Sequence, residues 1–288
     1  MPHGRHLTLG RRTLVMGIVN VTPDSFSDGG VYAAPDDAVA HGLSLAAAGA
    51  DLIDVGGEST RPGAAPVAID DERRRVLGVI EALSAQVAVP LSVDTTRPEV
   101  AAEAVAAGAG VINDVSMLRD GPALAAVAAQ TGAGLILMHS RGTPATMQDE
   151  ADYDGDPVTI VRRELDGAVR VAARAGVQPD RLLIDPGIGF AKTAATSLMI
   201  LSRLEEFTGG RWPVVVGVSR KSFIGEVLDL PVADRLEGTL AAETAAAMAG
   251  AAMVRTHDVV ASRRAVQVAD ALRRQPPRTG RTVGRLAS

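Results

Sequence analysis

The stretch Leu14-Val15-Met16-Gly17-Ile18-Val19 ends at Asn20 and opens into Val21-Thr22-Pro23-Asp24-Ser25-Phe26-Ser27-Asp28-Gly29-Gly30. An apolar run of this length that stops at a cluster of Pro, Asp, Ser and Gly predicts a buried strand followed by a long loop. The loop holds an amide, carboxylates and hydroxyls, the oxygen donors that hard cations prefer, together with one aromatic ring. We therefore expect this strand to deliver polar chemistry at its carboxyl end.

The same unit, a short β-branched run followed by an Ala-rich helical stretch, recurs along the chain. We predict strands over 14–19, 52–55, 89–93, 110–112, 134–138, 181–184, 213–218 and 252–256, and helices that include 36–48, 98–107, 121–130, 157–175 and 258–274. Eight alternations predict a parallel sheet closed as a single α/β (β/α)8 TIM barrel over 1–274. The rival is an open doubly wound sheet, but no Gly-x-Gly-x-x-Gly turn follows the first strand. The tail 275–288 lacks apolar periodicity, and we expect it to be disordered.

Composition excludes several classes of protein. The chain has 288 residues, of which 47% are hydrophobic but only 2% aromatic, so aliphatic side chains and alanine must fill the core. A net charge of −5 argues against non-specific binding to nucleic acid or to a membrane surface. The absence of cysteine excludes disulfides and thiolate chemistry. No apolar run approaches the roughly 20 residues that span a bilayer, so we expect a cytoplasmic protein.

Polar or charged residues follow every predicted strand. In (β/α)8 barrels the chemistry sits at the carboxyl ends of the strands. Each residue alone has an ordinary structural explanation: Asp94 could cap a helix, Asn113-Asp114 is a common turn pair, and His139 could be a half-buried strand histidine. Their convergence at one end of one barrel instead indicates a binding site.

The cationic members of this set indicate a ligand with several negative charges. Arg255 and His257 precede a predicted helix, whose N-terminal N–H groups favour phosphate. Thr60 and Arg61 can add a hydroxyl and a guanidinium. Asn20 can hold Mg²⁺ on the same phosphates, because Mg²⁺ takes few protein ligands and keeps water. These features predict a diphosphate site.

The remaining strand ends alternate hydrogen-bond acceptors and donors deeper in the barrel. They are Asp94, Asn113, Asp185 and Lys221. Carboxylate and amide edges suit a flat heterocycle with several N–H and carbonyl groups. A buried carboxylate beside a lysine is tolerated only when it is paired or matched by the ligand, which makes such a set selective.

Seven motifs, in order, resemble dihydropteroate synthase between about residues 12 and 272. They are NVTPDSFSDGG (20–30), DVGGESTRPG (54–63), SVDT (92–95), IND (112–114), LMH (137–139), DPGIGF (185–190) and SRKS (219–222). The family folds as a (β/α)8 barrel and joins (7,8-dihydropterin-6-yl)methyl diphosphate to 4-aminobenzoate in folate synthesis. The resemblance therefore implies a transferase with two small-molecule substrates, competition by sulfonamides, and a homodimer formed through late helices such as 238–250.

The resemblance also implies roles for individual residues. Asp94, Asn113, Asp185, Gly217 and Lys221 would line the pterin pocket, with Met138 and Phe190 against the ring; Thr60, Arg61, Arg255 and His257 would hold the diphosphate and Asn20 the Mg²⁺; Phe26, Pro62 and Ser222 would shape the aminobenzoate site. The expected catalytic residues are Asp94, Lys221, Arg255 and His257. Cations on the leaving group and an anionic Asp94 near the developing positive charge would stabilise an SN1-like transfer without a covalent enzyme intermediate.

Two alternatives stay open. The pterin-binding barrel of corrinoid methyltransferases shares the Asp-Asn-Asp set, but it does not need the loop 20–30 or the pair Arg255 and His257. A catalytically inactive paralogue that binds pterin would usually lose loop or lysine residues, and these are intact. Departures from the family pattern are small: Thr256 stands where Val is usual, and 193–197 lacks a frequent His-Asn.

Overall fold

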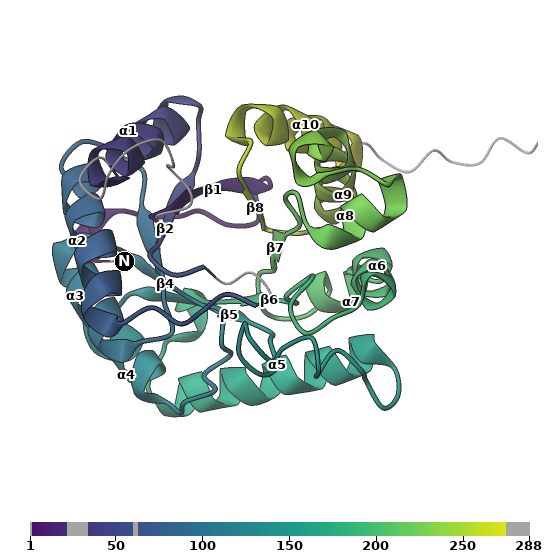
Figure 1. Cartoon of the computed structure of the whole chain (residues 1–288), viewed down its shortest axis with the longest axis horizontal. Helices are drawn as coiled ribbons and strands as arrows, with labels where there is room; N and C mark the ends of the chain where they lie inside the picture. Colours follow the sequence, from purple (N-terminus) through teal and green to yellow (C-terminus); the bar gives the residue numbers. More distant parts are fainter. Residues whose placement is uncertain (1, 22–33, 60–62, 275–288) are drawn as a thin grey trace, which may run out of the picture.

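Eight parallel strands form a barrel in the part of the chain that the structure describes. The structure is a computed structural model that describes residues 2–21, 34–59 and 63–274 (Figure 1). The strands pair in the order β6-β5-β4-β3-β2-β1-β8-β7. A parallel bridge between Ile184 and Val214 joins the two ends of this order, and it closes the sheet. The predicted (β/α)8 fold is confirmed. The strands are β1 (Leu14–Asn20), β2 (Leu52–Gly56), β3 (Leu91–Asp94), β4 (Val111–Asp114), β5 (Gly134–Met138), β6 (Leu182–Asp185), β7 (Val215–Gly217) and β8 (Met253–Thr256).

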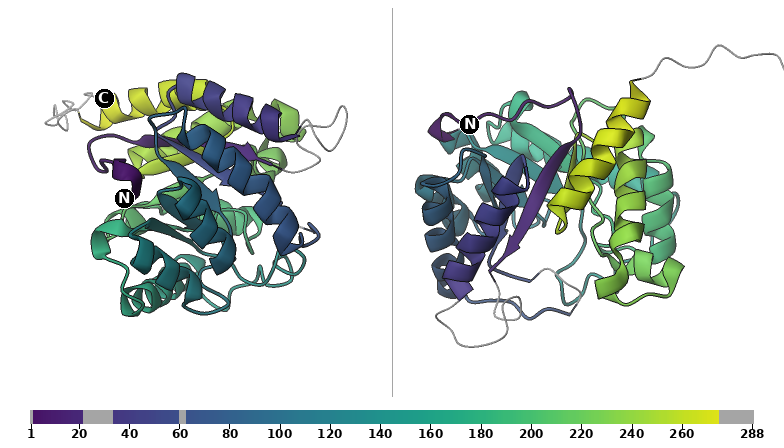
Figure 2. Two further views of the ribbon diagram at one scale, coloured as in Figure 1. Left: turned by 90° about the vertical axis from the view of Figure 1, so that its left-hand side faces the viewer. Right: turned by 90° about the horizontal axis from the view of Figure 1, so that it is seen from above.

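Helices surround the barrel, as the views of Figure 2 show. The five helices predicted from the sequence agree with the structure to within two residues at each end. No helix within the described ranges is long and apolar enough to cross a membrane. The helices are α1 (Ala34–Ala47), α2 (Ile69–Ser84), α3 (Pro98–Ala107), α4 (Ala123–Thr131), α5 (Pro157–Arg174), α6 (Ala194–Ser202), α7 (Glu205–Thr208), α8 (Ser222–Leu228), α9 (Leu236–Met248) and α10 (Val259–Arg273).

Several strands extend further toward their carboxyl ends than the sequence predicted, whereas β5 and β8 end as predicted and β7 ends one residue earlier. Asp94, Asp114 and Asp185 lie inside β3, β4 and β6, beyond the predicted ends at 93, 112 and 184. Their backbones continue the parallel ladder, since Asp94 pairs with Asn113, and Asp185 pairs with Met138. Polar side chains thus occupy the last rungs of the barrel rather than the loops that follow.

Inward and outward side chains alternate along the strands, as the pleat of a β-strand requires. Along β2, Ile53 and Val55 pack outward against the helices, whereas Leu52 belongs to a separate apolar cluster inside the barrel. Leu7 and Leu9 of the N-terminal segment pack against that inner cluster. It consists of Leu14, Met16, Leu52, Val111, Ile136, Leu183, Val215 and Met253.

The next inward position on these strands carries the polar chemistry. Two residues after an inner apolar residue, the side chain again points into the barrel, closer to the carboxyl end. These second positions are Asp54, Asn113, Met138, Asp185, Gly217 and Arg255. The period of two therefore places an apolar floor below and a ring of functional side chains above, in a single closed sheet.

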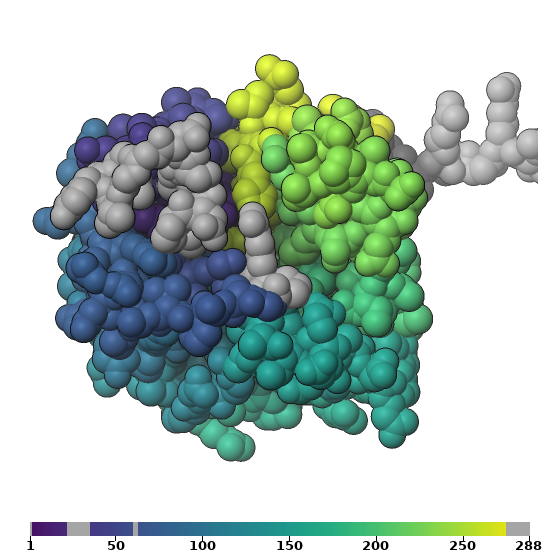
Figure 3. Space-filling view, in the orientation of Figure 1, coloured from purple at the N-terminus to yellow at the C-terminus, as the bar shows by residue number. Residues whose placement is uncertain are grey.

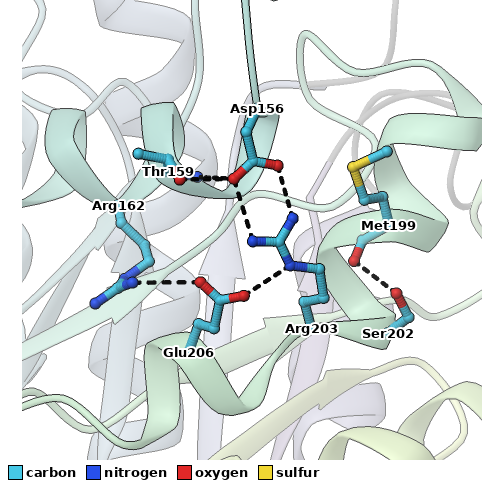
Figure 4. Close-up of polar contacts among 7 residues, drawn as sticks. All are labelled: Asp156, Thr159, Arg162, Met199, Ser202, Arg203 and Glu206. Carbon is cyan, nitrogen blue, oxygen red and sulfur yellow. Dashed lines mark hydrogen bonds and ion pairs between the residues drawn. The ribbon is translucent and has the colours of Figure 1, made fainter.

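A network on the outer surface fixes the start of α5 against α6 and α7 (Figure 4). Asp156 caps α5 by accepting a hydrogen bond from the Thr159 amide at 3.1 Å. The Arg203 guanidinium donates to both Asp156 oxygens, at 2.6 and 3.1 Å, and to Glu206 at 2.7 Å. Proline at the first position of α5 suits this start, because its missing N–H has no partner there in any helix.

A buried carboxylate on α10 holds the start of β1. Asp270 Oδ2 accepts a hydrogen bond from the Thr13 amide at 2.8 Å, and Asp270 Oδ1 accepts one from the Thr13 hydroxyl at 2.9 Å. Both residues are buried. These contacts join the last helix to the first strand of the barrel.

We predict that Asp270→Ala lowers the free energy of unfolding by about 2–4 kcal/mol, because two buried donors of Thr13 lose their acceptor. Chemical denaturation followed by circular dichroism measures this loss. Asp234→Ala removes an exposed carboxylate before α9 and should change stability by no more than about 0.5 kcal/mol. Equal effects of the two variants would contradict the assigned role of Asp270.

Candidate active site

Asp54 is the polar centre of the upper end of the barrel. Its side chain is fully buried on β2. Asp54 Oδ1 accepts a hydrogen bond from Ser92 Oγ at 2.6 Å, and Oδ2 accepts bonds from Asn113 Nδ2 at 3.0 Å and Arg255 Nε at 2.7 Å. One carboxylate therefore connects β2 to β3, β4 and β8.

Arg255 lies between two carboxylates. Besides Asp54, it donates from Nη2 to Asp94 Oδ2 at 2.9 Å. Burial raises the pKa of Asp94 to about 7, because the Asp54 charge adds to the effect and the Arg255 charge only partly offsets it. Asp94 is thus a carboxyl group whose charge responds to what binds beside it near neutral pH.

Asp185 and Lys221 form the opposite side of the ring. Burial raises the pKa of Asp185, and the Lys221 charge partly offsets this shift. Burial lowers the pKa of Lys221 to about 8. Lys221 Nζ donates to the carbonyl oxygen of Ile188 and lies 4.4 Å from the centre of the Phe190 ring, within the range of a cation–π contact. The predicted neighbours Asp185, Phe190 and Lys221 are brought together.

The part of the site that can bind an anion lies where β7 and β8 end. Ser219 Oγ is 2.9 Å from His257 Nδ1 and accepts a hydrogen bond from the His257 amide at 3.2 Å. Arg220 donates to both oxygens of Asp258, at 2.9 and 2.7 Å, and this pair joins the two loops. His257 and Asp258 immediately precede α10, whose N-terminus favours bound anions.

Glycine at position 217 keeps space open between the two cations of the ring. A Cβ atom at this position would lie 3.9 Å from Lys221 Nζ and 3.8 Å from Arg255 Cβ. Any larger side chain at the end of β7 would therefore enter the space that the ring encloses. Gly217 fits its predicted place in the substrate pocket.

The other predicted residues separate into two groups. Asn20 is half-buried at the end of β1, Met138 is buried at the end of β5, and Ser222 is exposed as the first residue of α8. The remaining predicted residues lie outside the described ranges, so the structure does not place them. They are Phe26, Thr60, Arg61 and Pro62, together with the loop residues Asp24 and Asp28.

The pair Asn113-Asp114 combines a site role and a turn role. Asn113 points inward to Asp54, whereas Asp114 accepts hydrogen bonds from the Ser116 amide, the Ser116 hydroxyl and the Leu118 amide. His139 differs from the expectation of a half-buried histidine, because it is fully buried between Lys192 and Glu164. Sequence reasoning also gave Asp54 no role, although its inward register two residues after Leu52 could have indicated one.

A cavity of about 400 Å³ lies beside the ring and includes Asp94 and Phe190 in its walls. The loops that follow β2 and β5 also line it, and they meet where the Gly63 amide donates to the Pro144 carbonyl at 2.9 Å. The described residues of both loops lie on the face turned to the viewer in Figure 3. The cavity gives a ligand held by the ring a place to extend toward the barrel mouth.

The oxygen donors of the protein suit a metal ion that is held mainly by the phosphate oxygens of a bound diphosphate. No cluster of three or more His, Cys, Asp or Glu among the described residues could hold a metal ion. Asn20 offers one amide oxygen at the mouth of β1. Mg²⁺ commonly uses one or two protein oxygens, phosphate oxygens and water, so Asn20 suits a Mg²⁺ that arrives with a diphosphate.

The class of this protein follows from its barrel fold together with a match to a known family of pterin-binding enzymes. The model of the family described as pterin binding enzyme matches residues 16–257, and the chain belongs to this family. The dihydropteroate synthase of Synechocystis is 47% identical over 264 residues, which are 91% of each chain. Within the family, this chain stands among the dihydropteroate synthases, transferases that form dihydropteroate for folate synthesis.

Solved structures agree with this assignment. The dihydropteroate synthase of Xanthomonas albilineans in complex with 7,8-dihydropteroate is 45% identical, with a TM-score of 0.85 over 95% of this chain and 98% of that chain. The Yersinia pestis enzyme with a sulfonamide drug is 44% identical, with a TM-score of 0.87 over 93% and 98% of the two chains.

We predict that Asp54→Asn moves the acidic limb of the kcat/KM profile to lower pH. The Asp54 charge raises the pKa of Asp94, so its removal lowers that pKa and keeps Asp94 anionic in more acidic solution. Initial rates between pH 5 and 9 measure the shift. Asp70→Asn, which alters an exposed carboxylate on α2, should leave the limb in place. An unmoved or upward-shifted limb in Asp54→Asn would contradict this coupling.

Proposed function

We propose that the inward ring of strand-end side chains carries the synthase reaction of this chain. The observation behind this proposal is the meeting of polar side chains at the carboxyl ends of the strands. Asp94, Asn113 and Asp185 lie within the last two residues of β3, β4 and β6. Arg255 on β8 donates to Asp94, and Lys221, between β7 and α8, donates to the loop that follows β6. The two carboxylates and the amide match the N–H and carbonyl edge of a pterin ring, while Lys221 and Phe190 lie against it. His257 and the start of α10 receive the diphosphate, with Thr60 and Arg61 added from the loop after β2.

The transfer begins with loss of the diphosphate. The bond between the pterin methylene carbon and the diphosphate oxygen breaks, and the electron pair stays with the diphosphate. The positive charge that develops on the pterin lies near the Asp94 carboxylate, in a buried site where this attraction is strong. The amine nitrogen of 4-aminobenzoate then bonds to the methylene carbon and loses its proton to solvent.

Mg²⁺ is the proposed metal, with Asn20 as its protein ligand. When bound, it would neutralise part of the charge on the diphosphate and so favour its departure. Phe26, Pro62 and Ser222 are proposed to shape the aminobenzoate site. In support of this role, Ser222 is exposed at the start of α8 and follows Lys221 directly in the chain.

An incubation with three components separates the synthase from its alternatives. The purified chain is mixed with the pterin diphosphate, 4-aminobenzoate and Mg²⁺, and dihydropteroate is measured by chromatography. Product that depends on all three supports the proposal. Bound pterin without product would indicate an inactive paralogue, and methyl transfer from a methylated pterin to a corrinoid would indicate the methyltransferase.

We predict that Lys221→Ala lowers kcat/KM by at least about 100-fold, because the variant removes both a pterin contact and a cation from a buried site. Steady-state kinetics with the pterin diphosphate as varied substrate measures the loss. Arg174→Ala removes an exposed cation at the end of α5 and should retain the wild-type rate. Near-normal activity of Lys221→Ala would remove this residue from the site.

Sulfonamides are predicted to compete with 4-aminobenzoate, as the dihydropteroate synthase of Yersinia pestis has been solved with such a drug. Rates measured at several 4-aminobenzoate concentrations should give inhibition that a large excess of this substrate removes. Inhibition that persists at saturating 4-aminobenzoate, or no inhibition at millimolar sulfonamide, would contradict a shared site.

We also propose that the chain acts as a homodimer. Exposed apolar side chains gather on α6, α8 and the turn after α8: Leu198, Met199, Val227, Leu228 and Val232. The range 238–250, expected from the sequence, contributes one exposed large apolar residue, Met248, since the other residues exposed there are small or polar. Light scattering with Val227→Glu as the test variant measures the assembly.

The cytoplasmic location stays a prediction.

A further inference from the structure

The chain uses lysine at two positions only. Of 29 Lys and Arg residues, Lys192 and Lys221 are the lysines, and all the others are arginines. Both lysines contact the loop that follows β6. An arginine cannot lose its proton in a protein, whereas a buried lysine can, and its ammonium group is more compact. A chain that otherwise relies on arginine therefore keeps a small titratable amine at two places around one loop.

The two amines bind alternate carbonyl groups of this loop. Lys221 Nζ donates to the carbonyl of Ile188, and Lys192 Nζ donates to that of Phe190 at 2.9 Å. The Tyr153 hydroxyl donates to the next carbonyl, that of Ala191, at 3.0 Å. Ala191 has a φ of 47°, in the left-handed region that non-glycine residues rarely adopt. The loop thus holds an unfavourable backbone conformation because three side chains fix consecutive parts of it.

A buried relay fixes the amine of Lys192. Its Nζ lies 2.9 Å from His139 Nδ1, and His139 Nε2 lies 2.9 Å from Glu164 Oε2. Arg141 donates to both oxygens of Glu164 and holds that carboxylate in its ionised form. An ionised carboxylate can only accept, so the imidazole proton resides on Nε2 and Nδ1 accepts a hydrogen bond from Lys192. A continuous chain of hydrogen bonds therefore leads from Arg141 through Glu164, His139 and Lys192 to the carbonyl of Phe190.

The groups around Lys192 favour an uncharged amine. It is 3% exposed. Burial is the main cause that lowers the pKa of Lys192 well below its ordinary value, and the nearby charges of Lys221 and Arg141 act in the same direction. Asp185 and Glu164 oppose this shift. His139 stays neutral, since burial lowers its pKa to about 4.

We propose that Lys192 is a positioning residue for the pterin pocket, which sets the Phe190 ring against Lys221 by holding the Phe190 carbonyl. This inference rests on the proposed pterin site. Phe190 links the two lysines. Its carbonyl accepts a hydrogen bond from Lys192, and its ring lies 4.4 Å from Lys221 Nζ. A displaced Phe190 carbonyl therefore moves a wall of the pocket, although Lys192 itself does not touch the pterin. The role requires a compact donor without a fixed charge.

Substitutions at position 192 test the donor and the charge separately. Lys192→Met keeps an unbranched side chain that is one atom shorter and removes the donor, so it should raise the KM for the pterin diphosphate by about tenfold. The KM for 4-aminobenzoate should stay within about twofold, because the altered wall belongs to the pterin pocket. Lys192→Gln retains neutral N–H donors and should recover part of the loss. Lys192→Arg should recover none, since a larger permanent cation cannot enter this buried place.

Arg203→Met is the matched control. It removes a cation and its hydrogen bonds from the same α5–α6 region, but at the outer network of Figure 4 and away from the loop. It should leave both KM values unchanged. An unchanged pterin KM in Lys192→Met would overturn the proposal, as would recovery by Lys192→Arg. Equal increases in both KM values, parallel to a loss of stability, would indicate a merely structural role and also overturn it.

Binding and titration experiments distinguish this inference from the function on which it rests. Protein labelled with ¹³C at the lysine Cε gives two lysine side-chain signals, and Lys192→Met assigns them. The pterin diphosphate alone should shift both signals in the wild type. A wild type that binds no pterin would defeat the proposed function, whereas binding with a Lys192 signal that neither shifts nor titrates below the ordinary lysine pKa near 10.4 would defeat the positioning role alone.

Discussion

An ion pair between the fully buried Asp54 and the partly buried Arg255 holds the polar end of this barrel together. The two residues lie on β2 and β8, on either side of β1, and they are 201 positions apart in the chain. Removing two charges from water is costly, and the cost is offset only where geometry and further hydrogen bonds are good. Asp54 meets this condition through Ser92 and Asn113. The amide of Asn113 and the guanidinium that reaches Asp94 thus take their places from one carboxylate.

The polar side chains at the carboxyl end of the barrel include more carboxylates than cations. The carboxylates are Asp54, Asp94 and Asp185, while the cations are Arg255 and Lys221. Burial raises the pKa of Asp94 and Asp185 and lowers that of Lys221. A ligand that presents N–H donors and develops positive charge relieves this imbalance, whereas water or an anion at the same place does not. The burial of these groups beside one another therefore favours a ligand of complementary charge.

Side-chain contacts fix several of the described loops at the carboxyl end of the barrel. Asp114 folds the loop after β4 onto itself, Arg220 joins the loops after β7 and β8 through Asp258, and Lys192 holds the loop after β6. Ala191 and Arg220 both have positive φ angles without being glycine. Such conformations persist where the surroundings hold the backbone from several sides. These contacts hold the backbone of the loops after β4, β6, β7 and β8, and so they fix the position of the side chains that these loops present.

Local patterns in the sequence determined the class of fold and predicted the members of the proposed site. The apolar runs and the Ala-rich helices between them predicted the barrel, because strand and helix periodicity is a property of neighbouring residues. The polar residue after each run named Asp94, Asn113, Asp185, Lys221 and Arg255, since parallel strands end at one edge. Only the closed tertiary structure decided which acid binds Arg255, that Asp54 is the centre, and that His139 is buried beside Lys192. These pairings depend on strand register and barrel closure, which bring together residues that have no relation along the chain.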